Sequence, residues 1–277
     1  MDSRIVRAVR LIERDMADSI CFDTVAARVG LSSSRFHHLF RETVGQPPET
    51  YLRRIRLDAA ALRLQWTSEP VGLIAIGLGY QSQAAFTKAF QRRFGMPPQR
   101  YRTEYLRTVL SDSVPAGRSR ISVREVPSFT MLAARYVGNP WEVREYWRDF
   151  EKRLPPGKQR WKNSIFVGLL HDDPRTTPVH ETRYDCCVVL TDGASLDWQT
   201  AAANGLQLIR SRPGPYGCLR FRGHRDDLLP AYDLLCTHWV RNSSFAITED
   251  PAIEVHARPR HRMDVDKLDL TLLLALE

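Results

Sequence analysis

The sequence predicts a multidomain chain, with an all-α unit of two helix-turn-helix motifs over residues 1–107 and an α+β unit over residues 121–277. The evidence for the first unit is a repeat, because the segment that opens at Ser34 returns imperfectly 50 positions later at Ala84. The evidence for the second unit is a change from helical spacing to strand-like alternation. Residues 108–120 are rich in Ser, Pro and Gly and are the expected linker.

The repeat aligns aromatic, glycine and proline positions. The matched pairs are Phe36–Phe86, Phe40–Phe90, Gly45–Gly95, Pro47–Pro97, Pro48–Pro98 and Tyr51–Tyr101. Each half has the pattern of a helix, a turn containing glycine, a second helix capped by serine, and a Gly-x-Pro-Pro stop. That order predicts one helix-turn-helix in each half.

Apolar residues at helical spacing predict the helices of the first unit. The expected ranges are 4–17, 23–29, 33–44, 49–66, 71–78 and 82–94. In the second helix of each motif, phenylalanines four residues apart form the stripe expected to be buried. Gly45 and Gly95 are expected to end these helices with positive φ angles.

The second unit carries one order of elements twice, namely strand, helix, strand, strand. Strands are expected at 121–126, 130–137, 165–170, 184–190, 206–212, 217–222, 253–257 and 268–275, and helices at 141–154 and 226–240. A duplication of this kind is expected to leave a cleft between its halves, which is a common place for a ligand.

The excess of positive charge lies in the first unit. Residues 1–107 hold 17 Lys and Arg against 10 Asp and Glu, whereas residues 108–277 hold 23 against 22. A basic surface is typical of phosphate binding, and arginine also recognises guanine edges. Combined with two helix-turn-helix patterns, the charge favours double-stranded DNA as a partner over a merely hydrophilic surface.

Other classes of protein are disfavoured. No apolar run reaches the roughly 18 residues that span a membrane, and the N-terminus does not resemble a signal peptide. Five cysteines without CxxC spacing argue against a disulfide framework and a cysteine zinc site, and favour the cytoplasm. The sequence lacks a Ser-His-Asp order or a nucleophile elbow, so no catalytic residue, cofactor or metal is assigned. Adjacent helical residues such as His37 and His38 point about 100° apart, which disfavours a shared metal.

Residues 18–103 resemble the AraC/XylS family of transcription activators, whose signature tract matches IAIGLGYQSQAAFTKAFQRRFGMPPQRYR at 74–102. Residues 121–277 resemble the GyrI-like effector-binding domain in the segments RYVGNPWEVREYWRDF, RYDCCVVL, PGPYGCLRFRGHRDDL and PAIEVHA. The order of the two is that of Rob-type regulators. The resemblance implies a cytoplasmic transcription regulator that binds DNA, senses a small molecule and contacts RNA polymerase.

The resemblance also implies which residues contact DNA. The positions that match the family's base-reading residues are Ser34, His37 and His38 in the first motif and Gln83, Ala84 and Lys88 in the second. The residues beside them are Arg35, Arg41 and Thr87, of which the arginines are placed to reach phosphates. Relatives often carry Trp, Gln and Arg at the first set, so the operator is expected to differ. The alternative is that these are ordinary exposed helix residues.

In the second unit, Glu254 is the candidate effector-binding residue. On its strand Ile253 and Val255 face one way, while Glu254 and His256 face the other. If the first pair packs on the helices, Glu254 faces the cleft between the repeats. GyrI-like domains that bind cationic compounds use acidic and aromatic groups there, which implies a cationic or aromatic effector. The aromatic candidates are Trp141, Trp147, Tyr216 and Trp239.

Several alternatives remain open for the second unit. Trp147 and Trp239 also lie on core stripes, and Glu254 could be an exposed edge charge. His256 replaces the tyrosine usual in the family, which leaves the ligand specificity open. The unit could instead be a small-molecule hydrolase with Glu254 as a general base, or a ligand-free protein-interaction module. The sequence does not specify the effector, the operator, activation or repression, or the oligomeric state.

Overall fold

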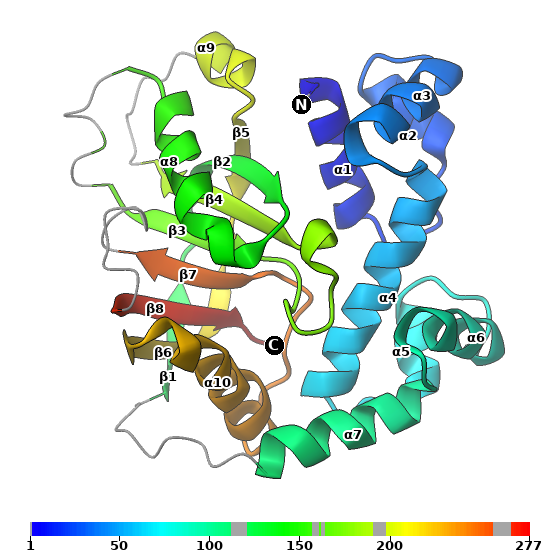
Figure 1. Cartoon of the computed structure of the whole chain (residues 1–277), viewed down its shortest axis with the longest axis vertical. Helices are drawn as coiled ribbons and strands as arrows, with labels where there is room; N and C mark the ends of the chain where they lie inside the picture. Colours follow the sequence, from blue (N-terminus) through cyan, green and yellow to red (C-terminus); the bar gives the residue numbers. More distant parts are fainter. Residues whose placement is uncertain (1, 112–120, 157–160, 162–163, 191–197, 257–266) are drawn as a thin grey trace. The chain divides into compact units, whose positions relative to one another are not determined.

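The computed structural model describes residues 2–111, 121–156, 161, 164–190, 198–256 and 267–277 of this chain. The chain divides into two compact units, Met1–Arg107 and Thr108–Glu277 (Figure 1). In its described part, no helix combines the length and the apolar composition that crossing a bilayer requires.

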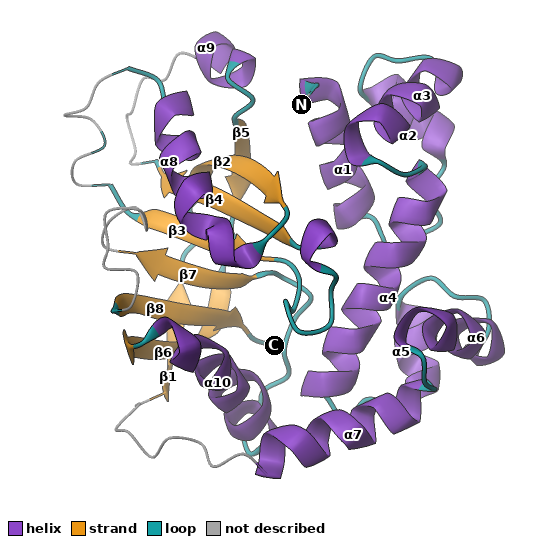
Figure 2. Cartoon of the chain, in the orientation of Figure 1, coloured by secondary structure: helices purple, strands orange, loops and turns teal. Residues whose placement is uncertain are grey.

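The first unit is entirely helical, as expected (Figure 2). Its helices are α1 (Ser3–Arg14), α2 (Phe22–Arg28), α3 (Ser33–Val44), α4 (Pro48–Trp66), α5 (Val71–Gly77), α6 (Gln83–Phe94) and α7 (Pro98–Ser111). The pairs α2–α3 and α5–α6 are the two helix-turn-helix motifs, and α4 joins them. Gly30 and Gly79 lie in the turns of the two motifs and have φ angles of 73° and 75°.

Helix α7 is absent from the sequence expectation. The Gly-x-Pro-Pro tract ends α6, but Pro98 is also the first residue of α7, just as Pro48 is the first of α4. Proline suits the first helical position because its fixed φ is helical and its missing N–H has no partner there. The helix continues to Ser111, four residues into the expected linker, and 112–120 lie outside the described residues.

Two small cores stabilise the first unit, one for each motif. Phe36 and Phe40 are fully buried among α1, α2 and α4, with their ring centroids 5.5 Å apart. Phe86 and Phe90 of α6 repeat this arrangement, also at 5.5 Å, and pack against α4 and α5. Replacing one of these rings by alanine should cost about 3–5 kcal/mol.

Caps fix the ends of α3 and α6 as the repeat predicts. The Oγ atoms of Ser32 and Ser82 accept hydrogen bonds from the backbone N–H of Arg35 and Ala85. Both helices end in left-handed glycines, Gly45 at φ 83° and Gly95 at φ 75°. The same local chemistry therefore sets the length of both helices.

The second unit is an eight-stranded antiparallel sheet with helices. Its strands are β1 (Ile121–Val126), β2 (Thr130–Val137), β3 (Phe166–Leu170), β4 (Arg183–Val189), β5 (Gln207–Arg210), β6 (Gly214–Gly223), β7 (Ala252–His256) and β8 (Leu268–Ala275). The main helices are α8 (Val143–Arg153), α9 (Trp198–Ala203) and α10 (Leu228–Asp233), and α10 continues as a π-helical segment, Leu234–Trp239. The predicted α+β class is confirmed.

The strand order shows the duplication. It is β1-β6-β8-β7-β3-β4-β2-β5. Inward from either edge, an extra strand comes first, followed by the first, third and second strands of one half. One half is β2-α8-β3-β4 and the other is β6-α10-β7-β8, so the expected strand, helix, strand, strand unit is present twice. Each extra strand pairs with the other half, β1 with β6 and β5 with β2. The backbone pairing of β1 and β5 with strands of the other half therefore connects the two halves.

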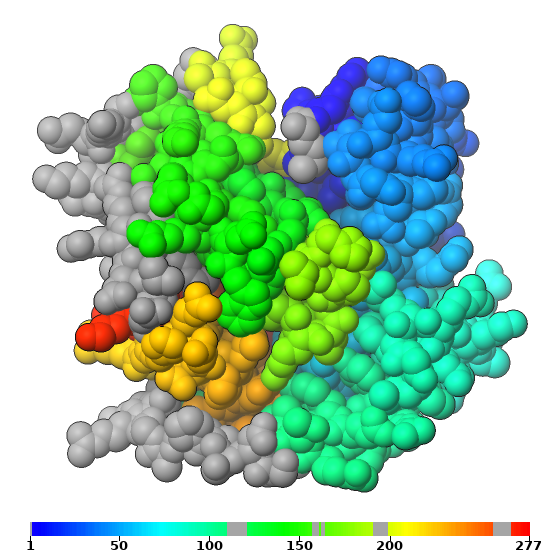
Figure 3. Space-filling model, in the orientation of Figure 1, coloured from blue at the N-terminus to red at the C-terminus, as the bar shows by residue number. Residues whose placement is uncertain are grey.

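Helices α8 and α10 lie on one face of the sheet, and their segments form that face of the unit in the space-filling view (Figures 2 and 3). Under α8 the core contains Trp147 and Phe150 from the helix, with Phe166 and Cys186 from the strands. The opposite face has its own apolar cluster, which includes Met131, Val167, Cys187, Tyr216 and Ile253.

Candidate functional site

Helices α3 and α6 present the same kind of surface. Behind the buried phenylalanines, Ser34, Arg35, His38 and Arg41 are exposed on α3, and His37 is half-buried. On α6, Gln83, Ala84 and Lys88 are exposed and Thr87 is half-buried. Seven of the nine residues expected to contact DNA are therefore exposed, and the other two, His37 and Thr87, are half-buried.

The charges on these faces differ in their partners. His37 Nδ1 lies 3.6 Å from Glu49 Oε1, and His38 Nε2 lies 3.3 Å from Glu42 Oε1. Among the described residues, no carboxylate pairs with Arg35, Arg41 or Lys88. Their positive charges are therefore available to an anion such as a phosphate.

The α6 surface includes a residue that the sequence analysis missed. Gln83, Ala84, Thr87, Lys88 and Gln91 line one shallow depression. Gln91 stands 50 positions after Arg41, so the repeat itself was the signal that could have identified it. An amide at this position can both donate and accept hydrogen bonds, which suits an adenine edge.

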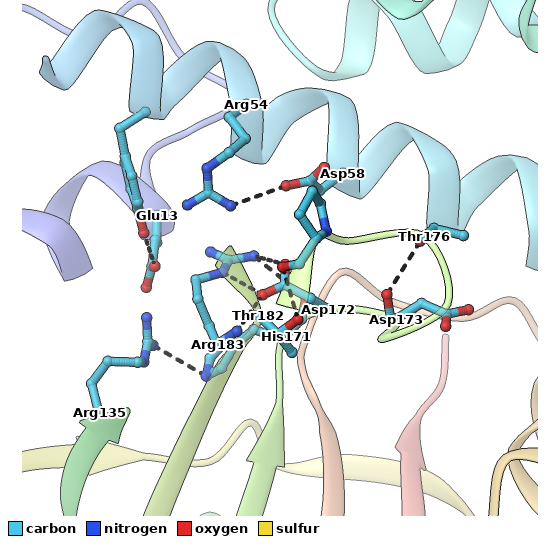
Figure 4. A network of polar contacts seen from close by, with 12 residues as sticks. Glu13, Arg54, Asp58, Arg135, His171, Asp172, Asp173, Thr176, Thr182 and Arg183 are labelled. Atoms are coloured by element: carbon cyan, nitrogen blue, oxygen red, sulfur yellow. Dashed lines mark hydrogen bonds and ion pairs between the residues drawn. The ribbon is translucent and has the colours of Figure 1, made fainter. Parts of the chain in front are cut away.

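A buried ion network fixes α6 on α4. Arg93 Nε donates to Asp58 Oδ1 at 2.7 Å, and Arg54 Nη1 donates to Asp58 Oδ2 at 3.2 Å. Figure 4 shows the Arg54–Asp58 pair. The Asp58 side chain is 2% exposed, so its charge is balanced by these two cations rather than by water. These ion pairs therefore link α6 to α4.

In the second unit, Glu254 is buried in the middle of the sheet and is 1% exposed. Tyr184 Oη donates to its Oε2 at 3.0 Å, and Tyr232 Oη donates to its Oε1 at 3.3 Å. His256 Nε2 lies 3.3 Å from Oε2. A buried carboxylate is costly without such partners. Any molecule that reaches this group must displace some of the side chains that cover it.

The face on which Glu254 lies corrects one expectation. Ile253 belongs to the cluster on the opposite face of the sheet, so the condition that it packs on the helices is not met. Glu254 and His256 instead lie on the helix side, where Glu254 contacts Tyr232 of α10 and His256 contacts Trp147 of α8. Alternation correctly separated the two pairs but did not specify which face the helices cover.

Gly168 provides space for this arrangement. It pairs with Glu254 across β3 and β7, the two central strands. A Cβ atom at this position would overlap the Tyr184 hydroxyl and lie 3.2 Å from Glu254 Oε2. The absence of a side chain at Gly168 therefore lets Tyr184 reach the carboxylate.

Trp147 is fully buried beside this carboxylate site. Its ring centroid lies 5.6 Å from that of His256 and 6.4 Å from that of Tyr184. Among the described residues, no hydrogen-bond acceptor is within reach of Trp147 Nε1. We call Glu254, His256, Tyr184, Tyr232 and Trp147 the carboxylate site. It brings together three predicted residues and adds two tyrosines that the sequence analysis did not assign.

The remaining aromatic candidates lie elsewhere. Tyr216 is in the cluster on the opposite face of the sheet, and burial raises its pKa to about 12. Trp239 stacks with Phe245 and packs over Gly217. Trp141 is 53% exposed beneath the guanidinium of Arg225, whose Cζ is 5.9 Å from the ring. The structure does not place these three side chains around Glu254.

Two of the cysteines and the possible metal ligands bear on the catalytic alternatives. Burial raises the pKa values of the Cys218 and Cys236 thiols, which disfavours the reactive thiolate. Within the described ranges, no three His, Cys, Asp or Glu side chains gather as a metal site. The carboxylate site combines a buried carboxyl group, two phenols that donate hydrogen bonds to it, and the indole ring of Trp147.

Comparisons with known proteins agree with this division. A helix-turn-helix domain model matches residues 25–104, and the model of the GyrI-like small molecule binding domain matches residues 119–276. The HTH-type transcriptional regulator MtrA of Neisseria gonorrhoeae is 30% identical over 103 residues, which are 37% of this chain and 34% of the relative. The transcriptional regulator Rob of Salmonella typhimurium is 32% identical over 91 residues, 33% of this chain and 32% of the relative.

Among solved structures, a transcriptional regulator with an AraC-type DNA-binding domain from Chromobacterium violaceum is 27% identical. The match covers 37% of this chain and 91% of that one, at a TM-score of 0.36. The chain spans about a third of the length of the curated relatives that it matches. The expected architecture, an AraC-type helix-turn-helix unit followed by a GyrI-like unit, is confirmed. Because the second model covers more than half of the residues, this chain belongs to the GyrI-like small molecule binding domain family.

Proposed function

We propose that this protein is a one-component transcription regulator. Residues 1–107 bind specific sites in double-stranded DNA, and the GyrI-like unit binds a small-molecule effector. The observation that carries the proposal is the repeated surface of α3 and α6, two capped helices whose buried and exposed positions match one for one.

The DNA-binding part of the proposal rests on shape and charge. A helix that enters the major groove needs a rigid base and a polar outer face. The phenylalanine cores supply the base, and Ser34, His37, His38, Gln83 and Lys88 supply groups that can hydrogen-bond to base edges. Arg35 and Arg41 supply cations for phosphates, and neither forms an ion pair with another described residue.

The effector part rests on the carboxylate site. Glu254 attracts a cation, Trp147 offers an aromatic surface, and the two tyrosines bind polar groups. This combination favours an amphipathic molecule with an aromatic part and a positive charge. We also propose RNA polymerase as a partner, because the resemblance to AraC-type activators implies it. The proposed compartment is the cytoplasm, where such a regulator would meet its DNA.

Selection of duplexes from a random pool by the purified full chain tests the DNA-binding part. One enriched motif with two half-sites is expected, and recovery of unrelated sequences would refute sequence-specific binding. Lys88→Ala should change the half-site read by α6 and leave the other unchanged, because each direct base contact is worth about 1–3 kcal/mol.

A thermal-shift screen of aromatic cations tests the effector part. A compound that binds the native state raises its melting temperature. The shift should be lost in Glu254→Gln and kept in Glu145→Gln, whose carboxylate is exposed on α8. A shift that survives in Glu254→Gln would place the effector elsewhere, and no shift from any compound would favour the interaction-module alternative.

A further inference from the structure

We infer that His256 is the internal counter-ion of Glu254 and that a cationic effector enters the carboxylate site in exchange for the proton on His256. The protein would then bind a permanent cation more tightly as the pH rises. This inference rests on the proposed function, in which Glu254 binds the effector. It assigns to His256 the control of charge selectivity.

The geometry brings the two groups into direct contact. Glu254 and His256 lie two residues apart on β7, so their side chains share one face of the sheet. His256 Nε2 is 3.3 Å from Glu254 Oε2, with side chains 0% and 1% exposed. Water therefore screens the pair poorly, and a proton on the imidazole is strongly attracted to the carboxylate. When the imidazole carries a proton, its charge lies where the charge of a cationic ligand would have to lie.

Among the described residues, the other ionisable groups in contact with the pair are two tyrosines, and a phenol ordinarily ionises at about pH 10. Tyr184 from β4 and Tyr232 from α10 donate hydrogen bonds to the carboxylate. Trp147 from α8 does not titrate. The strand partners of the pair are Gly168 and Phe166 on β3, and Leu272 and Leu270 on β8. Histidine is the side chain that ordinarily changes charge between about pH 5 and 8, so His256 is the group that sets the pH response.

The exchange balances in charge and in protons. With His256 protonated and Glu254 ionised, the pair is neutral, and adding a second cation leaves an uncompensated buried positive charge. Release of the imidazole proton to the buffer restores neutrality, because one carboxylate then faces one cation. Trp147 provides the aromatic surface against which that cation can rest, and its Nε1 has no acceptor among the described residues.

The test uses the phenyltrimethylammonium ion, which has no titrating group, and its uncharged isostere tert-butylbenzene. Calorimetry with the full chain between about pH 5.5 and 8 should show the affinity for the cation rising by up to tenfold per pH unit, the limit for one exchanged proton. The buffer takes up the released proton, so the measured heat of binding includes the ionisation enthalpy of the buffer. At about pH 6, the heats in phosphate and in MES should therefore differ by an amount that corresponds to up to one proton per bound cation. The affinity for tert-butylbenzene should not depend on pH.

The variant His256→Gln keeps a hydrogen-bonding side chain and removes the titrating group. It should bind the cation with little pH dependence and with higher affinity than the natural protein at about pH 6. Its melting temperature and its DNA affinity verify that both units are folded. If the variant does not fold, the number of protons released by the natural protein on cation binding tests the inference without it.

The outcomes separate the two claims. Cation binding without proton release, or with the same pH profile in His256→Gln, would overturn the role of His256 and leave the proposed effector site intact. Failure of both compounds to bind at any pH would overturn the effector site and the inference with it. Proton release that persists in Glu254→Gln would show that the exchanged proton comes from another group.

Discussion

At the scale of single residues, Arg183 controls the charge of Asp172. Arg183 Nε donates to Asp172 Oδ2 at 2.8 Å and Nη2 donates to Oδ1 at 2.6 Å (Figure 4). The backbone N–H of Arg183 also donates to Oδ2. Burial alone would raise the pKa of Asp172, but the guanidinium charge and these hydrogen bonds hold it below the usual value. The charge of Arg183 thus offsets the cost of burying the Asp172 carboxylate in the GyrI-like unit.

Arg183→Gln should therefore lower the free energy of unfolding by about 3–5 kcal/mol at pH 7, because it leaves a buried carboxylate without its cation. An aspartate with a lowered folded-state pKa contributes stability above its unfolded value of about 4 and loses it as the pH falls through the folded value. The deficit of the variant should therefore shrink below about pH 4. Urea unfolding at pH 7 and pH 3 measures it.

The matched control is Arg148→Gln, which removes an exposed partner of Glu145. An exposed pair is worth about 0–1 kcal/mol, so this variant should unfold nearly as the natural protein does. Equal losses for the two variants at pH 7 would contradict the role given to the Arg183–Asp172 pair.

The close approach of Tyr184 to Gly168 leads to a second prediction at this scale. Gly168→Ala should force Tyr184 away from Glu254, because the new methyl group overlaps the tyrosine hydroxyl. Overpacking of this kind costs about 1–3 kcal/mol. Chemical denaturation measures the loss of stability, and calorimetry should show weaker binding of phenyltrimethylammonium. Unchanged values for both would mean that the strands shift to absorb the methyl group.

At the scale of elements, the helices of the first unit could be predicted from sequence because their signals are local. Serine caps, left-handed glycines and phenylalanines at four-residue spacing each act within one or two turns. The repeat also gave every signal twice. Helix α7 was missed because Pro98 was interpreted as a stop for α6 and not also as the first residue of the next helix.

The carboxylate site could be predicted only in part, because its contacts are long-range. Tyr184 lies 70 residues and Tyr232 lies 22 residues from Glu254 in sequence. Strand alternation shows which residues share a face, but the position of α8 and α10 decides which face is covered. Tyr216 of β6 faces the opposite side of the sheet, and Trp239, in the π-helical segment after α10, packs over Gly217.

The ion pair between Arg93 of α6 and Asp58 of α4 leads to a prediction about how firmly α6 is held. Arg93→Gln should loosen α6 by removing its ion pair with Asp58, while Arg54 keeps the carboxylate neutralised. Affinity for the half-site read by α6 should fall by about 1–3 kcal/mol, with the half-site read by α3 unaffected. Fluorescence anisotropy with duplexes mutated in either half measures this. Arg92→Gln, an exposed neighbour on α6, is the control, and an equal loss there would indicate a phosphate contact instead.

At the scale of the whole molecule, function is divided between units of different charge and architecture. The excess of basic residues lies in 1–107, whereas 108–277 are nearly neutral. Long-range attraction to DNA should therefore come from the first unit, and it should weaken as salt rises. The GyrI-like unit has nearly balanced charge, and in the proposed function its buried Glu254 binds the effector.

The spacing of the two motifs is set by α4, and it gives the last prediction. Residues 48–66 make one helix, which at 1.5 Å per residue is about 28 Å long. Tyr51, Leu52 and Ile55 belong to the first core, and Leu57 and Leu64 to the second, so α4 is held at both ends. A rigid spacer should present α3 and α6 to major-groove segments about one helical turn, or roughly 10 bp, apart.

Insertion of about 5 bp between the half-sites should reduce binding to that of a single half-site, because the second major groove then faces the opposite side of the duplex. Insertion of about 10 bp restores the face but adds about 34 Å of separation, which α4 cannot span. Both duplexes should therefore bind equally weakly, at one chain per duplex. Recovery of affinity at the longer insertion would mean that the two motifs move independently. In that case α4 would be a flexible connection and would not fix the distance between the half-sites.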